Sequence, residues 1–192
     1  MNVMKLYPLM VAVALLASCA GGKYASTEKI YKSKAKTFSA IYKDVPAKGQ
    51  LEKVRSTDKE WIASTNFGLR KPNYVVIHHT AQKSLDQTIK TFHNEKVGVS
   101  SHYVIGRDGK VVQMVNDYFR AHHAGLGKWG NDSDLNSSSI GIELDNDGLT
   151  DPWTEVQINA LLNLLATLKE NYKIPQANFI GHMDLAPTRK KD

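Results

Sequence analysis

Apolar residues follow a regular pattern only in the second part of the chain, from about residue 74 onward. The run Tyr74–Ile77 joins four residues of high β-propensity without a charge, which predicts a buried central strand. Two histidines, His78 and His79, follow at its carboxyl end, where open α/β sheets place their ligands. Neighbouring strand residues point to opposite faces, so only one of these imidazoles can point into a given cleft. The strand does not indicate which one, because both of its faces are apolar.

Two helices and four further strands are predicted after this strand. The helices begin at Ser84 and Thr154, because each residue opens a Ser/Thr-x-x-Gln capping box. Asp108 and Gly109 are typical of a hairpin turn between the first two strands. The strands are predicted at residues 102–105, 111–115, 139–144 and 178–182. This order predicts the α/β fold class, as a single domain with a central mixed β-sheet flanked by helices.

The longest predicted helix, residues 154–172, carries apolar residues at a spacing that predicts one buried face. That face consists of Val156, Ile158, Leu161, Leu162, Leu165 and Leu168. Before residue 73 the chain is polar, rich in lysine and weakly periodic. Residues 27–42 can hold a helix, although no firm period emerges, and residues 58–62 are predicted as a short helical turn that packs Trp61 on the domain.

The first 18 residues have the features of a bacterial signal peptide. Lys5 precedes the apolar run Leu9–Leu16, which is too short to cross a bilayer comfortably. Leu16-Ala17-Ser18-Cys19 resembles the lipobox of bacterial lipoproteins, in which the cysteine becomes the acylated first residue. We therefore expect lipidation at Cys19 and a membrane-anchored lipoprotein facing the periplasm, with Ala20 favouring the outer membrane. The alternative is an ordinary secretory signal with an incidental cysteine.

Composition limits the domain count and the class of partner. With 192 residues, 42% of them hydrophobic, the chain can bury one proper core. We expect residues 1–18 to be the signal peptide, residues 19–65 a tether and N-terminal extension, and residues 66–192 the folded domain. The formal net charge is +6, with lysine and arginine scattered. This charge does not indicate nucleic acid, but it suits an anionic polymer or a membrane surface. The sequence does not indicate an oligomeric state.

One predicted strand carries a carboxylate where a buried strand normally has none. On residues 139–144, Glu143 shares a face with Gly141 and lies opposite the apolar residues. Such a carboxylate is either paired structurally or a working acid or base, and spacing alone does not decide between these. The preceding loop, residues 120–138, is rich in Gly, His, Asn and Ser, and loops of this length in compact domains are usually functional.

A metal site is a second possibility at the strand ends. His182 ends the last predicted strand, as His78 ends the first, and Asp192 lies in the following loop. Two histidines and one aspartate suit Zn²⁺, and three protein ligands leave a fourth position for water. No short ligand spacing announces the site, so residue chemistry alone gives it only weak support.

Five motifs in order and spacing resemble those of the type-2 N-acetylmuramoyl-L-alanine amidases, AmpD-like enzymes related to peptidoglycan recognition proteins. The motifs are Val-Ile-His-His-Thr-Ala (76–81), Ser-His-Tyr-Val-Ile-x-Arg-Asp-Gly (101–109), Arg-Ala-His-His-Ala-Gly (120–125), Ser-Ile-Gly-Ile-Glu-Leu (139–144) and Gly-His-x-Asp-x-Ala-Pro-x-Arg-Lys-x-Asp (181–192). The resemblance extends from about residue 73 to the end of the chain. It implies a zinc amidase fold and makes residues 66–192 a zinc-dependent amidase domain. The implied zinc ligands are His78, His182 and Asp192.

The resemblance also implies the roles of four further residues. His79 becomes the structural member of the histidine pair. Glu143 is similar to the family's proton-transfer residue, and Lys190 corresponds to the lysine that steadies the oxyanion. His123 stands where the family has its loop histidine beside the substrate cleft, and we expect it to contact the substrate.

The implied function is zinc-dependent hydrolysis of the amide bond between N-acetylmuramic acid and L-alanine, in peptidoglycan or muropeptides, for cell-wall turnover or recycling. The alternative is a non-catalytic peptidoglycan-binding lipoprotein, although family members of that kind commonly lose zinc ligands. Relatives usually continue past the last ligand, whereas this chain ends at Asp192. The expectation is either a C-terminally truncated fragment or a ligand carried on a free C-terminus.

Overall fold

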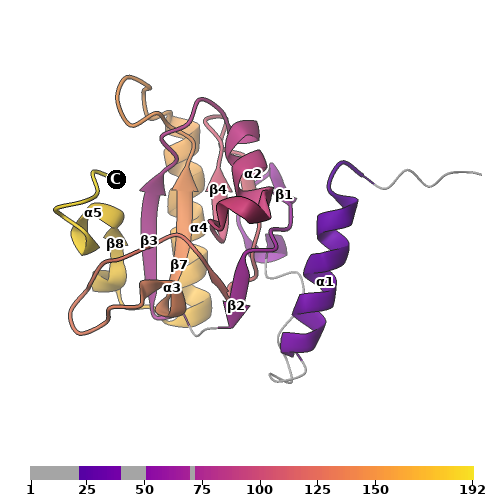
Figure 1. The fold of residues 1–192 in the computed structure, drawn as a ribbon. Helices are drawn as coiled ribbons and strands as arrows, with labels where there is room; N and C mark the ends of the chain where they lie inside the picture. The colour runs from indigo at the N-terminus through magenta and orange to yellow at the C-terminus, as the bar shows by residue number, and fades with distance from the viewer. Residues whose placement is uncertain (1–21, 40–50, 70–71) are drawn as a thin grey trace, which may run out of the picture.

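The computed structural model describes residues 22–39, 51–69 and 72–192. Its centre is a six-stranded mixed sheet with the strand order β1-β5-β4-β7-β3-β8 (Figure 1). Neighbouring strands run parallel except for the β4–β5 hairpin, which is antiparallel. The strands are β1 (Lys59–Trp61), β3 (Tyr74–His79), β4 (Tyr103–Ile105), β5 (Val111–Gln113), β7 (Ser139–Leu144) and β8 (Phe179–Gly181). The predicted fold class is therefore confirmed.

Helices and a second, two-stranded sheet surround this sheet. The small sheet pairs β2 (Phe67–Leu69) with β6 (Phe119–Ala121) in antiparallel fashion. The α-helices are α1 (Ala25–Ser39), α2 (Leu85–His93), α3 (Leu135–Ser138), α4 (Glu155–Tyr172) and α5 (His182–Leu185). The 3₁₀ turns are η1 (Leu51–Lys53), η2 (Glu95–Val97) and η3 (Gln176–Asn178). In the described ranges, no helix is both long enough and apolar enough to cross a membrane.

The local signals in the sequence mark the element boundaries of the second part of the chain. The Ser84 hydroxyl accepts a hydrogen bond from the Gln87 N–H and begins α2. Thr154 does the same for the N–H of Gln157 at the start of α4. Such side-chain caps satisfy backbone donors that lack a partner within the helix. Gly109, at a φ of 81°, makes the predicted hairpin turn between β4 and β5.

The buried face of α4 differs from the prediction. Val156 and Leu162 are 55% and 56% exposed. The residues that α4 buries are Gln157, Ala160, Leu161, Leu164, Thr167 and Leu168. A polar residue can take a core position here because the Gln157 amide donates hydrogen bonds to the carbonyls of Ile105 and Asp145. The apolar spacing alone could not predict this rotation of the helix.

The prediction for residues 58–62 is also wrong in part. They form no helical turn, because Lys59–Trp61 is the strand β1, which pairs in parallel with β5 at the edge of the sheet. The hydrogen-bonding partner of this strand lies about fifty residues along the chain, so no local period announces it. Trp61 does pack on the domain, with its ring centroid 5.1 Å from that of Tyr31.

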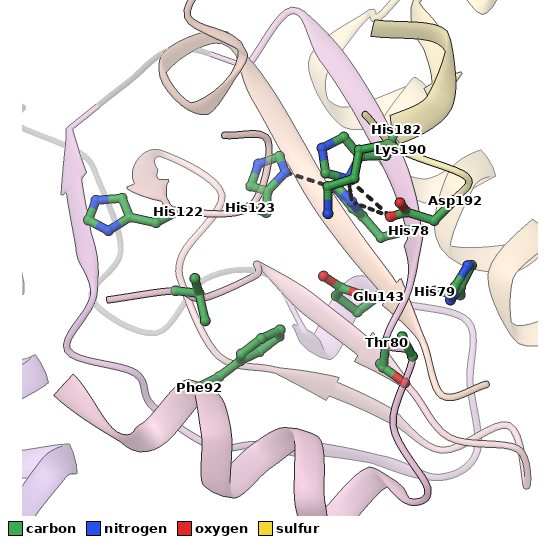
Figure 2. Close-up of a pocket in the computed structure, with 12 residues that line it drawn as sticks. His78, His79, Thr80, Phe92, His122, His123, Glu143, His182, Lys190 and Asp192 are labelled. Atoms are coloured by element: carbon green, nitrogen blue, oxygen red, sulfur yellow. Dashed lines mark hydrogen bonds and ion pairs between the residues drawn. The ribbon is translucent and has the colours of Figure 1, made fainter. Parts of the chain in front are cut away.

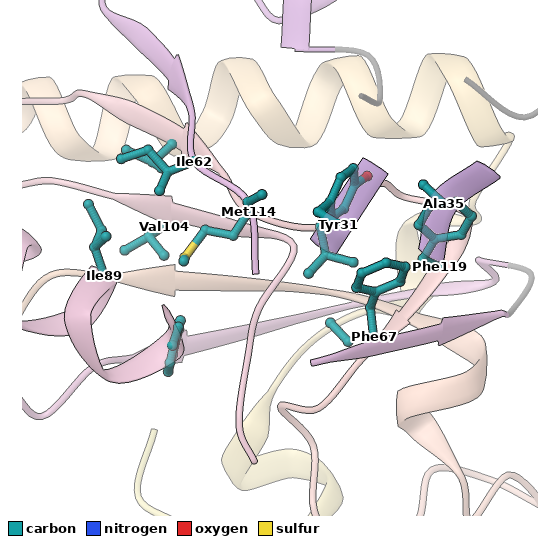
Figure 3. Packing of buried hydrophobic residues seen from close by; sticks show 13 residues of the cluster. Tyr31, Ala35, Ile62, Phe67, Ile89, Val104, Met114 and Phe119 are labelled. Carbon is teal, nitrogen blue, oxygen red and sulfur yellow. The ribbon is translucent and has the colours of Figure 1, made fainter. Parts of the chain in front are cut away.

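The helix α1 belongs to the same core as the sheet. Tyr31 and Ala35 are fully buried. Figure 3 shows them beside Phe67 and Phe119, and the Tyr31 and Phe67 ring centroids are 4.9 Å apart. The helix that residues 27–42 can hold is present as α1 at residues 25–39, and residues 40–42 lie outside the described ranges. The N-terminal segment therefore supplies buried side chains to the core of the domain.

Candidate metal centre and active site

The strand order brings together residues that lie about a hundred positions apart. β8 pairs with β3 in parallel, with Ile77 opposite Gly181. The next residue after each of these is a histidine, so His78 and His182 lie side by side. The chain then turns through α5, and Asp192 returns to the same place (Figure 2). The three predicted metal ligands therefore form one cluster.

Three ligand atoms of this cluster face one another. His78 Nδ1 lies 2.8 Å from His182 Nδ1. The Asp192 Oδ2 atom lies 3.3 Å from His78 Nδ1 and 3.0 Å from His182 Nδ1. Both histidines are almost fully buried, at 3% and 2% exposure. Among the described residues, this is the group of histidines and carboxylates that could hold a metal ion.

The outer nitrogens of the two imidazoles indicate which ring atoms are available to a metal. His182 Nε2 lies 2.8 Å from the Ala124 carbonyl oxygen, which can only accept, so Nε2 carries the proton. His78 Nε2 lies 3.0 Å from His123 Nδ1 and donates to it when that nitrogen is unprotonated. With Nε2 protonated, each Nδ1 can offer its lone pair to a cation; without a cation, it can carry a proton and donate to Asp192. Two imidazole nitrogens and one carboxylate oxygen converging on one point are ligand types that Zn²⁺ prefers, so the donor set fits Zn²⁺.

The protonation states of the cluster favour metal binding. Burial lowers the pKa of His78 to about 4, and the hydrogen bond to Asp192 opposes this only in part. Burial alone would raise the pKa of Asp192, but hydrogen bonds with His182 and His78 outweigh it and hold that pKa below its usual range. A neutral imidazole and an ionised carboxylate are the forms that coordinate metals.

Glu143 lies beside the cluster on the neighbouring strand. It is opposite His78 in the β3–β7 register, and both side chains line one cavity of about 240 Å³ (Figure 2). Its Oε2 atom is buried without a hydrogen-bond partner among the described residues. Burial, with the charge of Asp192, raises the pKa of Glu143 to about 8, against the opposing charge of Lys190. Lys190 lines the same cavity.

The structure separates the two strand-end histidines. His79 points away from the ligand atoms in Figure 2 and packs so closely on Gly148 that a Cβ there would lie 2.2 Å from its ring. His123 lines the cavity, where we expect substrate contact, and also touches His78. Gly141 makes room for it, because a Cβ on that residue would lie 2.5 Å from the His123 ring.

Sequence patterns missed the backbone and side-chain groups behind the histidines. The Ala124 carbonyl accepts from His182 Nε2 and also from Arg189, at 2.8 and 3.2 Å. The Asn136 side chain holds the loop from its other side. The only signal for these contacts was the length and polarity of the loop at residues 120–138. A motif records which side chains are present, but it does not show which carbonyl accepts a hydrogen bond.

Fold and site together define an α/β protein with a hydrolase-type centre, in which a two-histidine, one-aspartate donor set lies beside a buried glutamate. Residues 68–192 match the N-acetylmuramoyl-L-alanine amidase family, Amidase_2. The chain belongs to this family, and the family predicted from the motifs is confirmed.

Relatives of known sequence agree with this assignment. The chain is 35% identical over 133 residues to the N-acetylmuramoyl-L-alanine amidase AmiD of Escherichia coli strain K12, an alignment covering 62% of this chain and 47% of AmiD. It is 32% identical over 165 residues to the 1,6-anhydro-N-acetylmuramyl-L-alanine amidase AmpD of Haemophilus influenzae, covering 74% of this chain and 89% of AmpD. The aligned part of this chain thus spans about half of AmiD but most of AmpD.

Solved structures show the same fold. A selenomethionine derivative of AmpD superposes with a TM-score of 0.65 at 26% identity, over 74% of this chain and 90% of that one. The complex of Escherichia coli AmiD with anhydro-N-acetylmuramic acid-L-Ala-D-γ-Glu-L-Lys gives a TM-score of 0.59 at 32% identity, over 65% of this chain and 53% of AmiD. The amidase class expected from the sequence is therefore supported at the level of sequence and of fold.

Proposed function

We propose that this chain is a zinc-dependent hydrolase that cleaves the amide bond between N-acetylmuramic acid and L-alanine in peptidoglycan or muropeptides, for cell-wall turnover or recycling. The observation that carries the proposal is the convergence of the His78, His182 and Asp192 ligand atoms beside Glu143, whose buried Oε2 atom has no hydrogen-bond partner in the part of the chain that the structure describes. Muropeptide substrates are further supported by the AmiD relative, whose structure holds an anhydro-muropeptide.

The side chains of the cavity suit the steps of amide hydrolysis. Zn²⁺ held by the three ligands would supply a Lewis acid that lowers the pKa of water to about 7. Glu143 would accept the proton of the attacking water and return it to the leaving amine of L-alanine. Its buried position beside the ligand atoms suits this role, and a cation held there would keep the carboxyl ionised and able to accept a proton. The Lys190 ammonium would stabilise the oxyanion of the tetrahedral intermediate.

Metal content and wall digestion test this function together. We expect one Zn²⁺ per purified chain and release of free stem peptides from sacculi. The His78→Ala variant should lose stoichiometric zinc and digestion, whereas His79→Ala, its matched neighbour on the other face of the strand, should keep zinc. A parent protein that binds muropeptides but contains no zinc and releases no stem peptide would instead be a peptidoglycan-binding protein.

We further propose that the protein is a lipoprotein anchored through Cys19, facing the periplasm from the outer membrane. Cys19 lies outside the described residues, so the support is the Leu16-Ala17-Ser18-Cys19 motif alone. Acyl chains contribute about 0.8 kcal/mol per buried methylene, which is enough for stable anchorage when several are present. The Cys19→Ala variant should be released from the membrane fraction or remain unprocessed. Identical fractionation and maturation of parent and variant would contradict the anchor.

A further inference from the structure

Asn136 makes an unusual pair of contacts with the loop behind the metal histidines. It lies in the short helix α3, and its side-chain Oδ1 atom accepts hydrogen bonds from two consecutive backbone N–H groups. These belong to His123, at 2.9 Å, and to Ala124, at 2.8 Å. A single carboxamide oxygen therefore fixes the position of one dipeptide.

That dipeptide carries the outer hydrogen-bond partners of both metal histidines. His123 provides the Nδ1 atom that faces His78 Nε2 at 3.0 Å. Ala124 provides the carbonyl oxygen that accepts from His182 Nε2 at 2.8 Å. The partner of an outer imidazole nitrogen determines which nitrogen carries the proton and how the ring is oriented. The two ligand lone pairs thus depend on one short stretch of backbone.

We propose that Asn136 is a positioning residue of the metal centre, which orients His78 and His182 at once through the backbone of residues 123–124. This inference rests on the proposed zinc site. Among the described residues the hydrogen bonds of the Asn136 side chain go to residues 123 and 124 and to neither metal histidine, so its effect must pass through the loop.

Other side chains also hold this loop, but they bind different groups of it from those that Asn136 binds. Arg189 donates to the carbonyl of Ala124 at 3.2 Å and to that of Leu126, so it binds backbone carbonyl groups of the loop. The hydroxyl of Ser139 lies 3.4 Å from His123 Nε2, at the far side of that ring. Asn136 instead accepts hydrogen bonds from the backbone N–H groups of His123 and Ala124. Without its oxygen, two amides lose their acceptor, and the loop can rotate to find new ones.

Zinc affinity, measured by competition with a chelator, tests the proposal. Asn136→Ala should weaken zinc binding by about 10- to 100-fold, the usual effect of removing an outer partner of a metal ligand. Asn136→Asp keeps an acceptor oxygen in the same place and should bind zinc within about threefold of the parent. The matched control is Ser137→Ala, which removes hydrogen bonds of the same helix with Arg120 and Asp134 but none to residues 123–124. It should bind zinc like the parent.

A second measurement does not depend on metal. In the chelated protein, ¹H–¹⁵N correlation spectra should show a protonated Nε2 of His182, facing the Ala124 carbonyl, in the parent and in Asn136→Asp. Asn136→Ala should show a tautomer mixture in which part of the His182 population lacks that proton. Unchanged zinc affinity and an unchanged tautomer in Asn136→Ala would overturn the proposal, as would an equal zinc loss in Ser137→Ala. A parent that showed the expected tautomers but no amidase activity would contradict the proposed function and leave this role of Asn136 standing.

Discussion

Glu143 is placed where a carboxyl group keeps its proton more readily than it does in water. The residue is buried, its Oε2 atom has no hydrogen-bond partner among the described residues, and Asp192 adds a nearby negative charge. A cation held by His78, His182 and Asp192 would act in the opposite direction and favour the ionised carboxylate. The same residue can therefore be neutral in the metal-free protein and act as a base in the loaded one.

The first prediction at this scale concerns turnover. Glu143→Gln keeps the size of the side chain but cannot accept a proton from the attacking water. We expect cleavage of muropeptides to fall by about 10²- to 10⁴-fold, which is typical for a positioned acid–base group. Zinc content and muropeptide binding should be retained, and both are measured as controls. If the variant digests muropeptides at the parental rate, Glu143 is a structural carboxylate.

The second prediction concerns the stability of the metal-free protein as a function of pH. The folded-state pKa of Glu143 is about 8, above the ordinary glutamate value of 4.5, so the folded chain binds more protons than the unfolded chain between these values. The contribution of Glu143 to stability is therefore fully present below pH 4.5 and is lost as pH rises toward 8. At 1.36 kcal/mol per pKa unit, the full loss is about 3–5 kcal/mol.

Urea unfolding of the chelated protein at pH 5 and pH 8 measures this loss, with Glu143→Gln as the reference. His78 acts with the opposite sign, because its pKa is lowered to about 4 and its contribution is lost as pH falls. Since both proteins contain His78, the difference between them isolates Glu143. A parent and a variant with parallel pH dependence would show that Glu143 does not keep its proton on folding.

Among the elements, α1 packs buried side chains into the core, which its weakly periodic sequence did not predict. Its mean composition is polar, yet Tyr31 is fully buried against Trp61 and Phe67, at centroid distances of 5.1 and 4.9 Å. Tyr31→Ala should lower the free energy of unfolding by about 3–5 kcal/mol, as large aromatic truncations in cores do. Ile30→Ala is the control on the same helix, where the side chain is 48% exposed. Equal, small effects of both changes in urea unfolding would show that α1 is not docked.

The sequence predicted those elements that are determined by residues close by in the chain, and it missed those that are determined by distant residues. The strands β3 and β7 and the starts of α2 and α4 follow from β-propensity and capping residues within a few positions. β1 follows instead from pairing with β5, which no neighbouring residue reveals. The buried face of α4 includes Gln157 because its amide donates hydrogen bonds to the backbone carbonyls of Ile105 and Asp145, which a pattern of apolar residues does not reveal.

The candidate site shows the same division. Patterns at the strand ends identified His78, His182 and Glu143 as chemical candidates, because strand ends meet at one edge of a sheet. The choice between His78 and His79 needed the family resemblance, since both strand faces are apolar. Asn136 was not identified, because it acts on backbone N–H groups across the loop. A contact of that kind depends on the folded path of the chain rather than on residue types.

For the whole molecule, the N-terminal segment raises the question of where the folding unit begins. The family match starts at residue 68, and the sequence predicts a tether and N-terminal extension at residues 19–65. In the structure, however, β1 is an edge strand of the main sheet and α1 buries Tyr31 and Ala35 in its core. All the described residues of the metal cluster lie in the matched part, and none lies in α1 or β1.

A chain that begins at residue 66 therefore tests the division between stability and chemistry. It keeps every residue of the candidate centre but loses the strand that pairs with β5 and the helix that covers Phe67 and Phe119. We expect a markedly lower thermal midpoint and exposed apolar surface, detected by dye binding, because β5 becomes an edge strand and this core is opened. The fraction that remains folded at low temperature should still bind one Zn²⁺. If this chain instead melts at the parental temperature, the segment before residue 66 does not stabilise the domain and serves only as a tether.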